Sequence, residues 1–303
     1  MEFNYTKLIF SCELESNASD LYHFFAIRRE FAEIFRRAVG CDGKGKERCS
    51  SVRECPYEQV FSQEMSSNPY AIKRFQKPPL PFAFDPPLLP FPPNRGSRLE
   101  IGLTLAGNAV NHLLCFIDSV KAMLDQSPRG MSGVAKLLRI ESVDYLGNRM
   151  VIAEDGREVE TDRFSVLSMD GLEKTAILPT ESVSLTIATP LRILKDGLPV
   201  RELSFSALAM NLLRRMSAMA FYYCSMELDL DYRWMAKVSA DIEIEDNEFR
   251  WVEWGRNLAG IIGKGTFTGN LVEFHPCLLF GENFHAGKGS AYGLGCYSLD
   301  KAP

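Results

Sequence analysis

The chain lacks a long apolar run, since no stretch approaches the roughly 20 consecutive apolar residues of a membrane-spanning helix. Its first residues lack the basic start and apolar core of a secretory signal peptide, so we expect a cytoplasmic protein with no membrane association. An excess of positive charge is also missing, because the formal net charge is −5 at pH 7. Any binding of nucleic acid must therefore depend on local basic patches.

Histidine is scarce, with four residues, and the eight cysteines are not spaced as a disulfide framework. In a cytoplasmic protein we expect them to be free thiols or metal ligands. Cys41, Cys49 and Cys55 share one predicted loop. A structural zinc site needs four ligands, usually in close C-x-x-C pairs, and this loop offers three. We therefore predict no metal and no cofactor, and retain these three cysteines as the only zinc candidates.

The most informative segment, residues 281–296, places five glycines around His285 and Lys288. Ordered glycine costs backbone entropy, and it is kept where φ must be positive or where another group must approach the main chain closely. Exposed backbone N–H groups together with one cation are chemically suited to hold a phosphate. The segment therefore predicts a phosphate-binding loop, with a glycine-rich turn before a last strand at 291–299 as the alternative.

Two familiar phosphate-binding motifs do not fit this segment. A Walker loop requires G-x-x-x-x-G-K-[ST], whereas five residues separate Gly281 from Gly287, and Gly289 occupies the hydroxyl position. The dinucleotide fingerprint requires a following helix and an acidic residue about 20 positions later. Only ten residues follow Gly293. The two motifs are therefore excluded.

The first half of the chain alternates predicted strands and helices around an irregular insertion. Ser19 or Asp20 caps a helix that ends near residue 39, with Gly40 as its stop. Residues 41–97 contain the cysteines and a proline-rich stretch, which predicts an extended, polyproline-like excursion. The other predicted elements are strands at 7–14 and 98–106, a helix at 109–124, and a hairpin of 135–144 with 149–153.

The second half repeats this order. We predict strands at 181–188, 236–244 and 248–254, a further strand at 260–268 that could extend the sheet, and helices at 204–224 and 270–280. Ser204 or Ser206 is the predicted cap of the first of these helices. Each half therefore approximates β-α-β-β-α-β, the order of the ferredoxin-like unit that RNA-recognition modules use. The predicted fold class is α+β, with two tandem ferredoxin-like (RRM-like) domains whose antiparallel sheets carry helices on one face. We place the domains at 1–170 and 171–303.

At this point the residues resemble a known family, the CRISPR-associated RAMP-superfamily endoribonucleases that process precursor CRISPR RNA. The resemblance is strongest in the glycine-rich segment with His285 and Lys288. It extends to other segments of the second half, namely 189–192, 203–205 and 212–215. In the first half, 55–57, 60–61, 81–82 and 85–87 resemble the family's N-terminal insertion.

The resemblance implies a function. The family cleaves repeat RNA without a metal ion by attack of a ribose 2′-OH on the adjacent phosphate, which leaves a 2′,3′-cyclic phosphate. The partner would be CRISPR repeat RNA, with other CRISPR-associated proteins and a homodimer left open. The reaction needs a base, an acid, and cations or N–H groups that stabilise the charge on phosphorus.

Two histidines are candidates for proton transfer, because histidine suits either role at neutral pH. His23 lies beside Tyr22 at the start of the N-terminal helix, where enzymes of this family often carry a catalytic histidine. The usual mid-helix position here holds Glu33, so a capping role for His23 is the alternative. His285 matches a histidine of the family motif, and its alternative is a turn histidine that shapes the loop. The remaining histidines, His112 and His275, are expected to be structural.

Several cations and glycines are candidates for binding RNA. Arg29 shares the face of Tyr22, and Lys288 is held among glycines, whereas Arg36 and Arg37 are expected to pair with nearby acids. The predicted RNA-binding residues are Arg29, Arg192, Arg215, Gly287, Lys288, Gly289, Gly293 and Gly295. The predicted catalytic residues are His23, Tyr22 and His285.

Two functions of different classes follow. The first is a sequence-specific endoribonuclease, favoured by two domains in one chain with the complete C-terminal motif. The second is a non-catalytic RNA-binding RAMP subunit of an effector complex, favoured by the missing mid-helix histidine. We place the endoribonuclease first.

Overall fold

The computed structural model describes residues 3–15, 24–25, 27–41, 55–67, 77–87, 94–126, 135–154, 158–255 and 258–300. Three predicted site residues, Tyr22, His23 and Cys49, fall outside these described residues. Among the described helices, none combines the length and the apolar character that a membrane crossing requires.

The first half forms an antiparallel sheet with the strand order β2-β3-β1-β4-β5. Its strands are β1 (Asn4–Leu14), β2 (Phe82–Asp85), β3 (Arg98–Ala106), β4 (Ala135–Val143) and β5 (Arg149–Glu154). Along β1, Leu8, Phe10 and Cys12 are buried, while Lys7 and Ser11 are half-buried. Because successive side chains of a strand point to opposite faces, the apolar set lies on one face of the sheet and the polar set on the other.

Helices α1 (Ile27–Ala38) and α4 (Leu113–Gln126) enclose an aromatic core with this sheet. The Phe31 ring of α1 lies 4.9 Å from the Phe84 ring of β2, and Phe35 lies 4.9 Å from Phe116 of α4. Helix α1 ends at Ala38, and Gly40 has a φ of 65°, so the predicted stop of this helix is confirmed. Two short helices, α2 (Pro56–Phe61) and η2 (Gly107–His112), complete this half.

The second half forms a second antiparallel sheet with the order β10-β12-β7-β13, and β11 also pairs with β12. Its strands are β7 (Ser182–Leu191), β10 (Glu243–Glu245), β11 (Arg250–Glu253), β12 (Ala259–Thr268) and β13 (Tyr297–Leu299). Helices α6 (Phe205–Cys224) and α8 (His275–Phe284) supply buried side chains to its core. Ser204 caps α6 as predicted, because its side chain accepts a hydrogen bond from the Ala207 N–H.

Both sheets have the topology of the ferredoxin-like unit. In the first half β1 is central, β2 is at one edge, β3 lies between them, and β4 pairs with the other side of β1. In the second half β7, β10, β12 and β13 take these same places, and β11 is an additional strand that pairs with β12. The predicted fold class is therefore confirmed. Strand β6 (Leu167–Ser168) still pairs with β1, and β7 begins at Ser182. The domain boundary near residue 170 stays a prediction. The remaining elements are α5 (Met169–Thr175), β8 (Leu194–Lys195), β9 (Leu198–Pro199), α7 (Tyr232–Ser239), η3 (Val272–Phe274) and η4 (Ser290–Tyr292).

Two predicted elements are wrong in type or length. The predicted strand at 236–244 begins inside helix α7, because the Asp231 carboxylate accepts hydrogen bonds from the N–H groups of Arg233 and Trp234 and caps a helix there. Only its end forms β10. The last strand is β13 alone, since residues 290–292 form the 3₁₀ turn η4.

The proline-rich stretch, predicted as an extended excursion, also contains a strand. Residues Phe82–Asp85 form β2, which pairs with β3 from Leu105 to Gly102. β2 is the edge strand of its sheet, and this position tolerates neighbouring prolines because one side of the strand needs no partner. The structure thus places part of this stretch in the first sheet.

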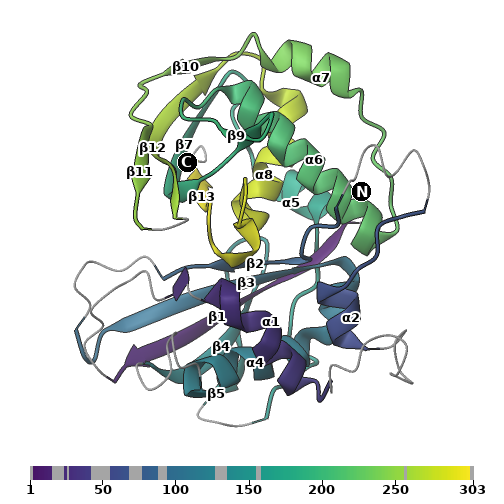
Figure 1. Cartoon of the computed structure of the whole chain (residues 1–303), viewed down its shortest axis with the longest axis vertical. Coiled ribbons are helices and arrows are strands. Elements are labelled where there is room, and N and C mark those ends of the chain that lie inside the picture. Colours follow the sequence, from purple (N-terminus) through teal and green to yellow (C-terminus); the bar gives the residue numbers. More distant parts are fainter. Residues whose placement is uncertain are drawn as a thin grey trace.

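The two halves meet through the segment that joins α8 to β13. Figure 1 shows this yellow segment descending from the second sheet to β2. Ala291 and Leu294 of this segment belong to the core of the first half, and the Tyr292 ring lies 5.6 Å from the Phe82 ring of β2. The glycine-rich segment predicted from the sequence therefore lies at the junction between the halves.

Candidate functional site

We call residues 285–296, between α8 and β13, the glycine loop. It begins at His285, whose N–H donates to the Gly281 carbonyl oxygen at 2.7 Å and whose φ is 59°. Non-glycine residues rarely adopt a positive φ, so the loop starts with a constrained turn. Its other end enters β13 at Tyr297, and the two ends are joined by a hydrogen bond from the Ala286 N–H to the Gly295 oxygen.

Steric contacts explain two of the loop's glycines. Gly287 has a φ of 75°, and a Cβ there would lie 2.7 Å from the Arg192 carbonyl oxygen. Gly295 has a φ of 67°, and a Cβ there would collide with the Ala286 carbonyl oxygen. Both positions therefore require glycine for backbone packing alone. RNA binding by these glycines, and by Gly289 and Gly293, stays a prediction.

The loop offers fewer free backbone N–H groups than the sequence suggested. The Lys288 N–H donates to the Arg192 oxygen at 2.8 Å, and the Gly287 N–H donates to the Asn211 side-chain oxygen at 2.8 Å. Further N–H groups of the loop, those of Ala286, Tyr292, Gly293, Leu294 and Cys296, also donate to protein oxygens. Anion binding at this loop must therefore depend mainly on side chains.

His285 is fully buried and faces the first sheet. Its Nε2 lies 3.0 Å from the Phe84 carbonyl oxygen and 3.1 Å from Asp85 Oδ1. Asp85 Oδ2 lies 3.0 Å from Lys7 Nζ, and these two side chains are 25% and 23% exposed. His285 thus connects the glycine loop to β2, and in this conformation its ring presents no surface to a ligand in solvent.

The charges of this junction affect one another. Burial raises the pKa of the Asp85 carboxyl group, but the charges of Lys7 and His285 lower it more, so the pKa lies below its ordinary value. Burial lowers the pKa of the His285 ring, whereas Cys296 and Asp85 raise it more, to about 10. These directions favour an ionised carboxylate beside a cationic imidazole.

Two arginines beside the loop have buried N–H groups without acceptors. Arg215 of α6 donates from Nε to the Phe284 carbonyl oxygen at 3.2 Å, while its Nη2 is buried and has no partner among the described residues. Arg192, at the end of β7, has a buried Nε that likewise lacks a described partner. Burial lowers the pKa of the Arg215 guanidinium to about 10. We call Arg192 and Arg215 the arginine pair.

The arginine pair and the loop converge on one region. Asn211 lies one helical turn before Arg215 on α6, so both side chains are on one face, and Asn211 binds Gly287. Lys288 follows at once in the chain and is exposed. Arg192 and Arg215 are both half-buried as whole residues, so each keeps some exposed surface that a phosphate in solvent can approach.

The N-terminal helix carries one exposed cation and one ion-paired cluster. Arg29 is exposed on α1. Glu33, in the mid-helix position, accepts hydrogen bonds from Arg36 at 2.7 and 2.8 Å and from Arg37 at 3.0 Å. These hydrogen bonds lower the pKa of the Glu33 carboxyl group to about 2. Glu33 is therefore a fixed, paired carboxylate at neutral pH and a poor proton carrier.

Two of the three cysteines named as zinc candidates, Cys41 and Cys55, lie within the described residues. Cys41 follows α1 and Cys55 precedes α2, and within the described ranges neither belongs to a group of three possible metal ligands. A third cysteine, Cys296 at the end of the glycine loop, lies close to Asp85 and His285.

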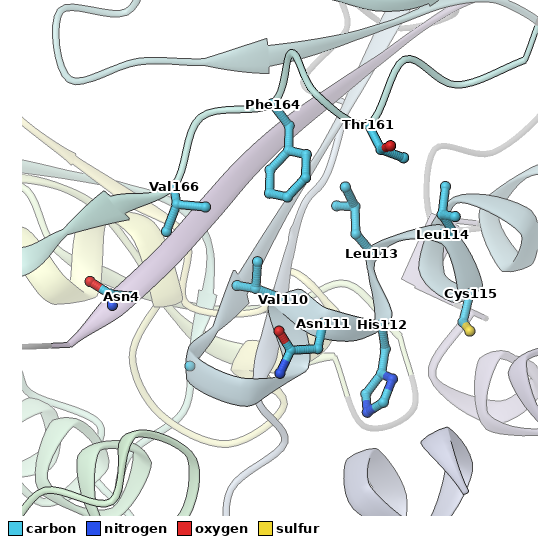
Figure 2. Close-up of a pocket in the computed structure, with 11 residues that line it drawn as sticks. Asn4, Val110, Asn111, His112, Leu113, Leu114, Cys115, Thr161, Phe164 and Val166 are labelled. Carbon is cyan, nitrogen blue, oxygen red and sulfur yellow. The ribbon is translucent and has the colours of Figure 1, made fainter. Parts of the chain in front are cut away.

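A cavity of about 640 Å³ lies on another part of the first half, between η2 and the segment 161–166. Figure 2 shows Phe164 and Val110 directed toward it. His112, which the sequence suggests is structural, lines it and lies 2.7 Å from the Gln59 side-chain oxygen. The described residues that line this cavity include no arginine or lysine, so they do not suit a phosphate group.

Sequence reasoning missed Lys7, Asp85 and Asn211. Lys7 is marked only by its position in an alternating strand, and Asp85 lies in a proline-rich stretch that predicted no regular structure. Their partners are far away in the chain, and Asp85 is 200 residues from His285. No local pattern could have revealed these contacts.

Two family models match the chain. Residues 3–164 match the AF_1859_N model, which is described as an N-terminal domain. Residues 185–297, which include the glycine loop and the arginine pair, match the model of the CRISPR-associated endoribonuclease Cas6. No curated protein matches the chain.

Solved structures with the same fold are Cas6 proteins. A Thermus thermophilus Cas6 (TTHB231) in a product complex is 16% identical, with 98% of this chain and 100% of that chain covered and a TM-score of 0.57. A Cas6 (TTHA0078) in a substrate mimic complex is 12% identical, with coverages of 98% and 99% and a TM-score of 0.52. With identities this low, the likeness shows a shared fold.

A third structure, a partial Cas6-RT-Cas1--Cas2 complex, is 13% identical with a TM-score of 0.61. The comparison covers 99% of this chain but only 46% of that one. The chain therefore spans less than half the length of that relative.

Proposed function

Because the chain belongs to the family of the AF_1859_N N-terminal domain, and its residues 185–297 match the Cas6 endoribonuclease model, we propose that it cleaves the repeats of precursor CRISPR RNA. The proposed cleavage needs no metal ion. In the proposed reaction a ribose 2′-OH attacks the adjacent phosphorus. The bond to the leaving 5′ oxygen breaks, and a 2′,3′-cyclic phosphate remains.

The observation that carries this proposal is the arginine pair. Arg192 contacts the glycine loop through its carbonyl oxygen, and Arg215 donates to the Phe284 oxygen just before the loop. Each arginine is half-buried and has one buried N–H group with no partner among the described residues. Lys288 of the loop adds an exposed cation, and RNA supplies a phosphate at every nucleotide. We therefore assign Arg192, Arg215 and Lys288 to binding the RNA backbone, with Arg29 contributing from α1.

Proton transfer needs a group outside the arginine pair, because an arginine side chain stays protonated at neutral pH. We assign this role to His23, assisted by Tyr22. Phe24, the residue after His23, has its ring 6.2 Å from the Phe84 ring, and the Phe84 carbonyl oxygen contacts His285. Phe24 is thus near the segment of β2 that contacts the glycine loop, which supports the assignment of its chain neighbour His23. His285 has two candidate roles, proton transfer and shaping of the glycine loop, and its burial supports the second.

The second candidate function is an RNA-binding subunit that does not cleave. The specific observation in its favour is Glu33, which occupies the mid-helix position and is bound by Arg36 and Arg37. In that case the arginine pair would hold RNA as proposed, but no residue would take the 2′ proton.

Incubation of the purified protein with labelled repeat RNA separates the two functions. Cutting at one position within the repeat supports the endoribonuclease. Arg214→Met is the control for a substitution of Arg215, because Arg214 is its exposed neighbour. Binding without cutting supports the RNA-binding subunit. If the protein neither binds nor cuts repeat RNA, both proposals are wrong.

A further inference from the structure

A second cluster of reactive side chains lies beneath the glycine loop. Asp85 ends β2, His285 begins the glycine loop, and Cys296 ends it. A carboxylate oxygen, a ring nitrogen and the Cys296 sulfur all lie within 4.8 Å of one another. His285 is fully buried, and the other two side chains are partly exposed. The proposed RNA site uses none of these three groups to touch RNA.

We propose that Asp85, His285 and Cys296 bind a Zn²⁺ ion that connects both ends of the glycine loop to the first sheet. Thiolate, imidazole and carboxylate are the ligands that zinc takes in proteins, whereas calcium and magnesium take oxygen ligands. With bonds of about 2.0 to 2.3 Å, tetrahedral zinc holds its ligand atoms roughly 3.3 to 3.7 Å apart. His285 Nε2 and Asp85 Oδ1 are 3.1 Å apart, close to that range, and the separations from these residues to the Cys296 sulfur are within 4.8 Å.

The surroundings provide further features of a zinc site. The Phe84 carbonyl oxygen lies 3.0 Å from His285 Nε2, close to where a fourth ligand atom would stand. Lys7 Nζ binds Asp85 Oδ2, which leaves Oδ1 directed at His285. Ligating carboxylates are commonly oriented by such outer hydrogen bonds. One thiolate and one carboxylate also balance the two charges of a divalent ion.

The ion would have a structural role. It would join His285 and Cys296, the two ends of the loop, and attach the loop to Asp85 of the other half. These bonds would fix the position of Lys288 and of the segment next to the arginine pair. Because the ion would have no place in the RNA chemistry, the inference is compatible with cleavage that needs no metal. It also stands if the protein binds RNA without cutting it.

Cobalt provides a direct test, since Co²⁺ occupies zinc sites and a thiolate ligand gives a charge-transfer band in the near ultraviolet. We expect this band when Co²⁺ is added to the metal-free full chain, and we expect Zn²⁺ to remove it. In Cys296→Ser the band should disappear, and in Asp85→Asn the affinity should fall by at least about 10- to 100-fold. The double variant Cys41→Ser/Cys55→Ser is the matched control and should keep the band.

A second measurement needs no variant and so does not depend on how the variants fold. Zn²⁺ should slow the alkylation of Cys296 by iodoacetamide, located by mass spectrometry, and leave the rate at half-buried Cys115 unchanged. An unchanged rate at Cys296 overturns the proposal. So does the absence of a cobalt band in the wild-type chain, or a band that survives in Cys296→Ser and is lost in the control.

Discussion

Replacement of Arg215 by methionine should make the free protein more stable and its binding of RNA weaker. Arg215 has no carboxylate partner among the described residues, and burial lowers the pKa of its guanidinium to about 10. A tenfold change in a protonation equilibrium corresponds to about 1.4 kcal/mol, so the buried charge costs the folded state on the order of 3 kcal/mol. Methionine has a similar length and fills the same space without a charge.

The substitution also removes the hydrogen bond from Arg215 Nε to the Phe284 oxygen, a bond from a charged donor worth about 1.5 to 3 kcal/mol. Taking the lower end for its distance of 3.2 Å, we expect a net gain of roughly 1 to 2 kcal/mol. Arginine stays protonated in both states at neutral pH. The cost is therefore fully present below the folded pKa of about 10 and declines as the pH rises through it.

Urea unfolding followed by circular dichroism measures the change in stability, and filter binding measures the affinity for repeat RNA. Loss of a charge-assisted contact should weaken RNA binding by roughly 10- to 100-fold. Arg214→Met, at the exposed neighbouring position, should change stability by less than about 0.5 kcal/mol. A variant that is less stable than the wild type and binds RNA equally well would refute the reasoning, because Arg215 would then be a structural residue.

Three further predictions concern the loop and the proposed catalytic group. Lys288→Ala should weaken RNA binding and reduce the slope of log K against log salt concentration by about one. Stability should change little because Lys288 is exposed, and RNA titrations at several salt concentrations test the prediction. Gly295→Ala should cost about 2 to 5 kcal/mol in urea unfolding, against about 1 to 2 kcal/mol for Gly197→Ala, which has a φ of 80° and open space around it. Equal costs for the two would contradict the proposed backbone clash. His23→Ala should slow cleavage and leave RNA affinity unchanged, and an unaltered single-turnover rate would remove this assignment.

Much of the fold follows from local patterns. The alternation in residues 7–14, the cap at Ser204 and the stop at Gly40 correspond to real elements, and the order of strands and helices predicts both ferredoxin-like units. The errors arose where a local rule competed with another. Prolines masked the edge strand β2, and the Asp231 cap produced a helix where a strand was predicted.

Less of the candidate site could be predicted from the sequence. Its glycine loop was visible because glycines, a histidine and a lysine cluster within residues 281–296. The contacts that define it join distant segments, such as Asp85 with Lys7 and His285, or Asn211 with Gly287. The burial of His285 against Phe84 and Asp85 depends on how the two halves pack, which no local pattern reports.

The most direct test of the central proposal is incubation of the protein, in EDTA, with labelled repeat RNA and with copies that carry a 2′-deoxy substitution at each candidate cut site. We predict cleavage at one position, a 2′,3′-cyclic phosphate on the 5′ fragment, and complete loss of cutting in the matching 2′-deoxy copy. Cleavage that persists in that copy, or that requires added Mg²⁺, would contradict the proposed attack by the 2′-OH.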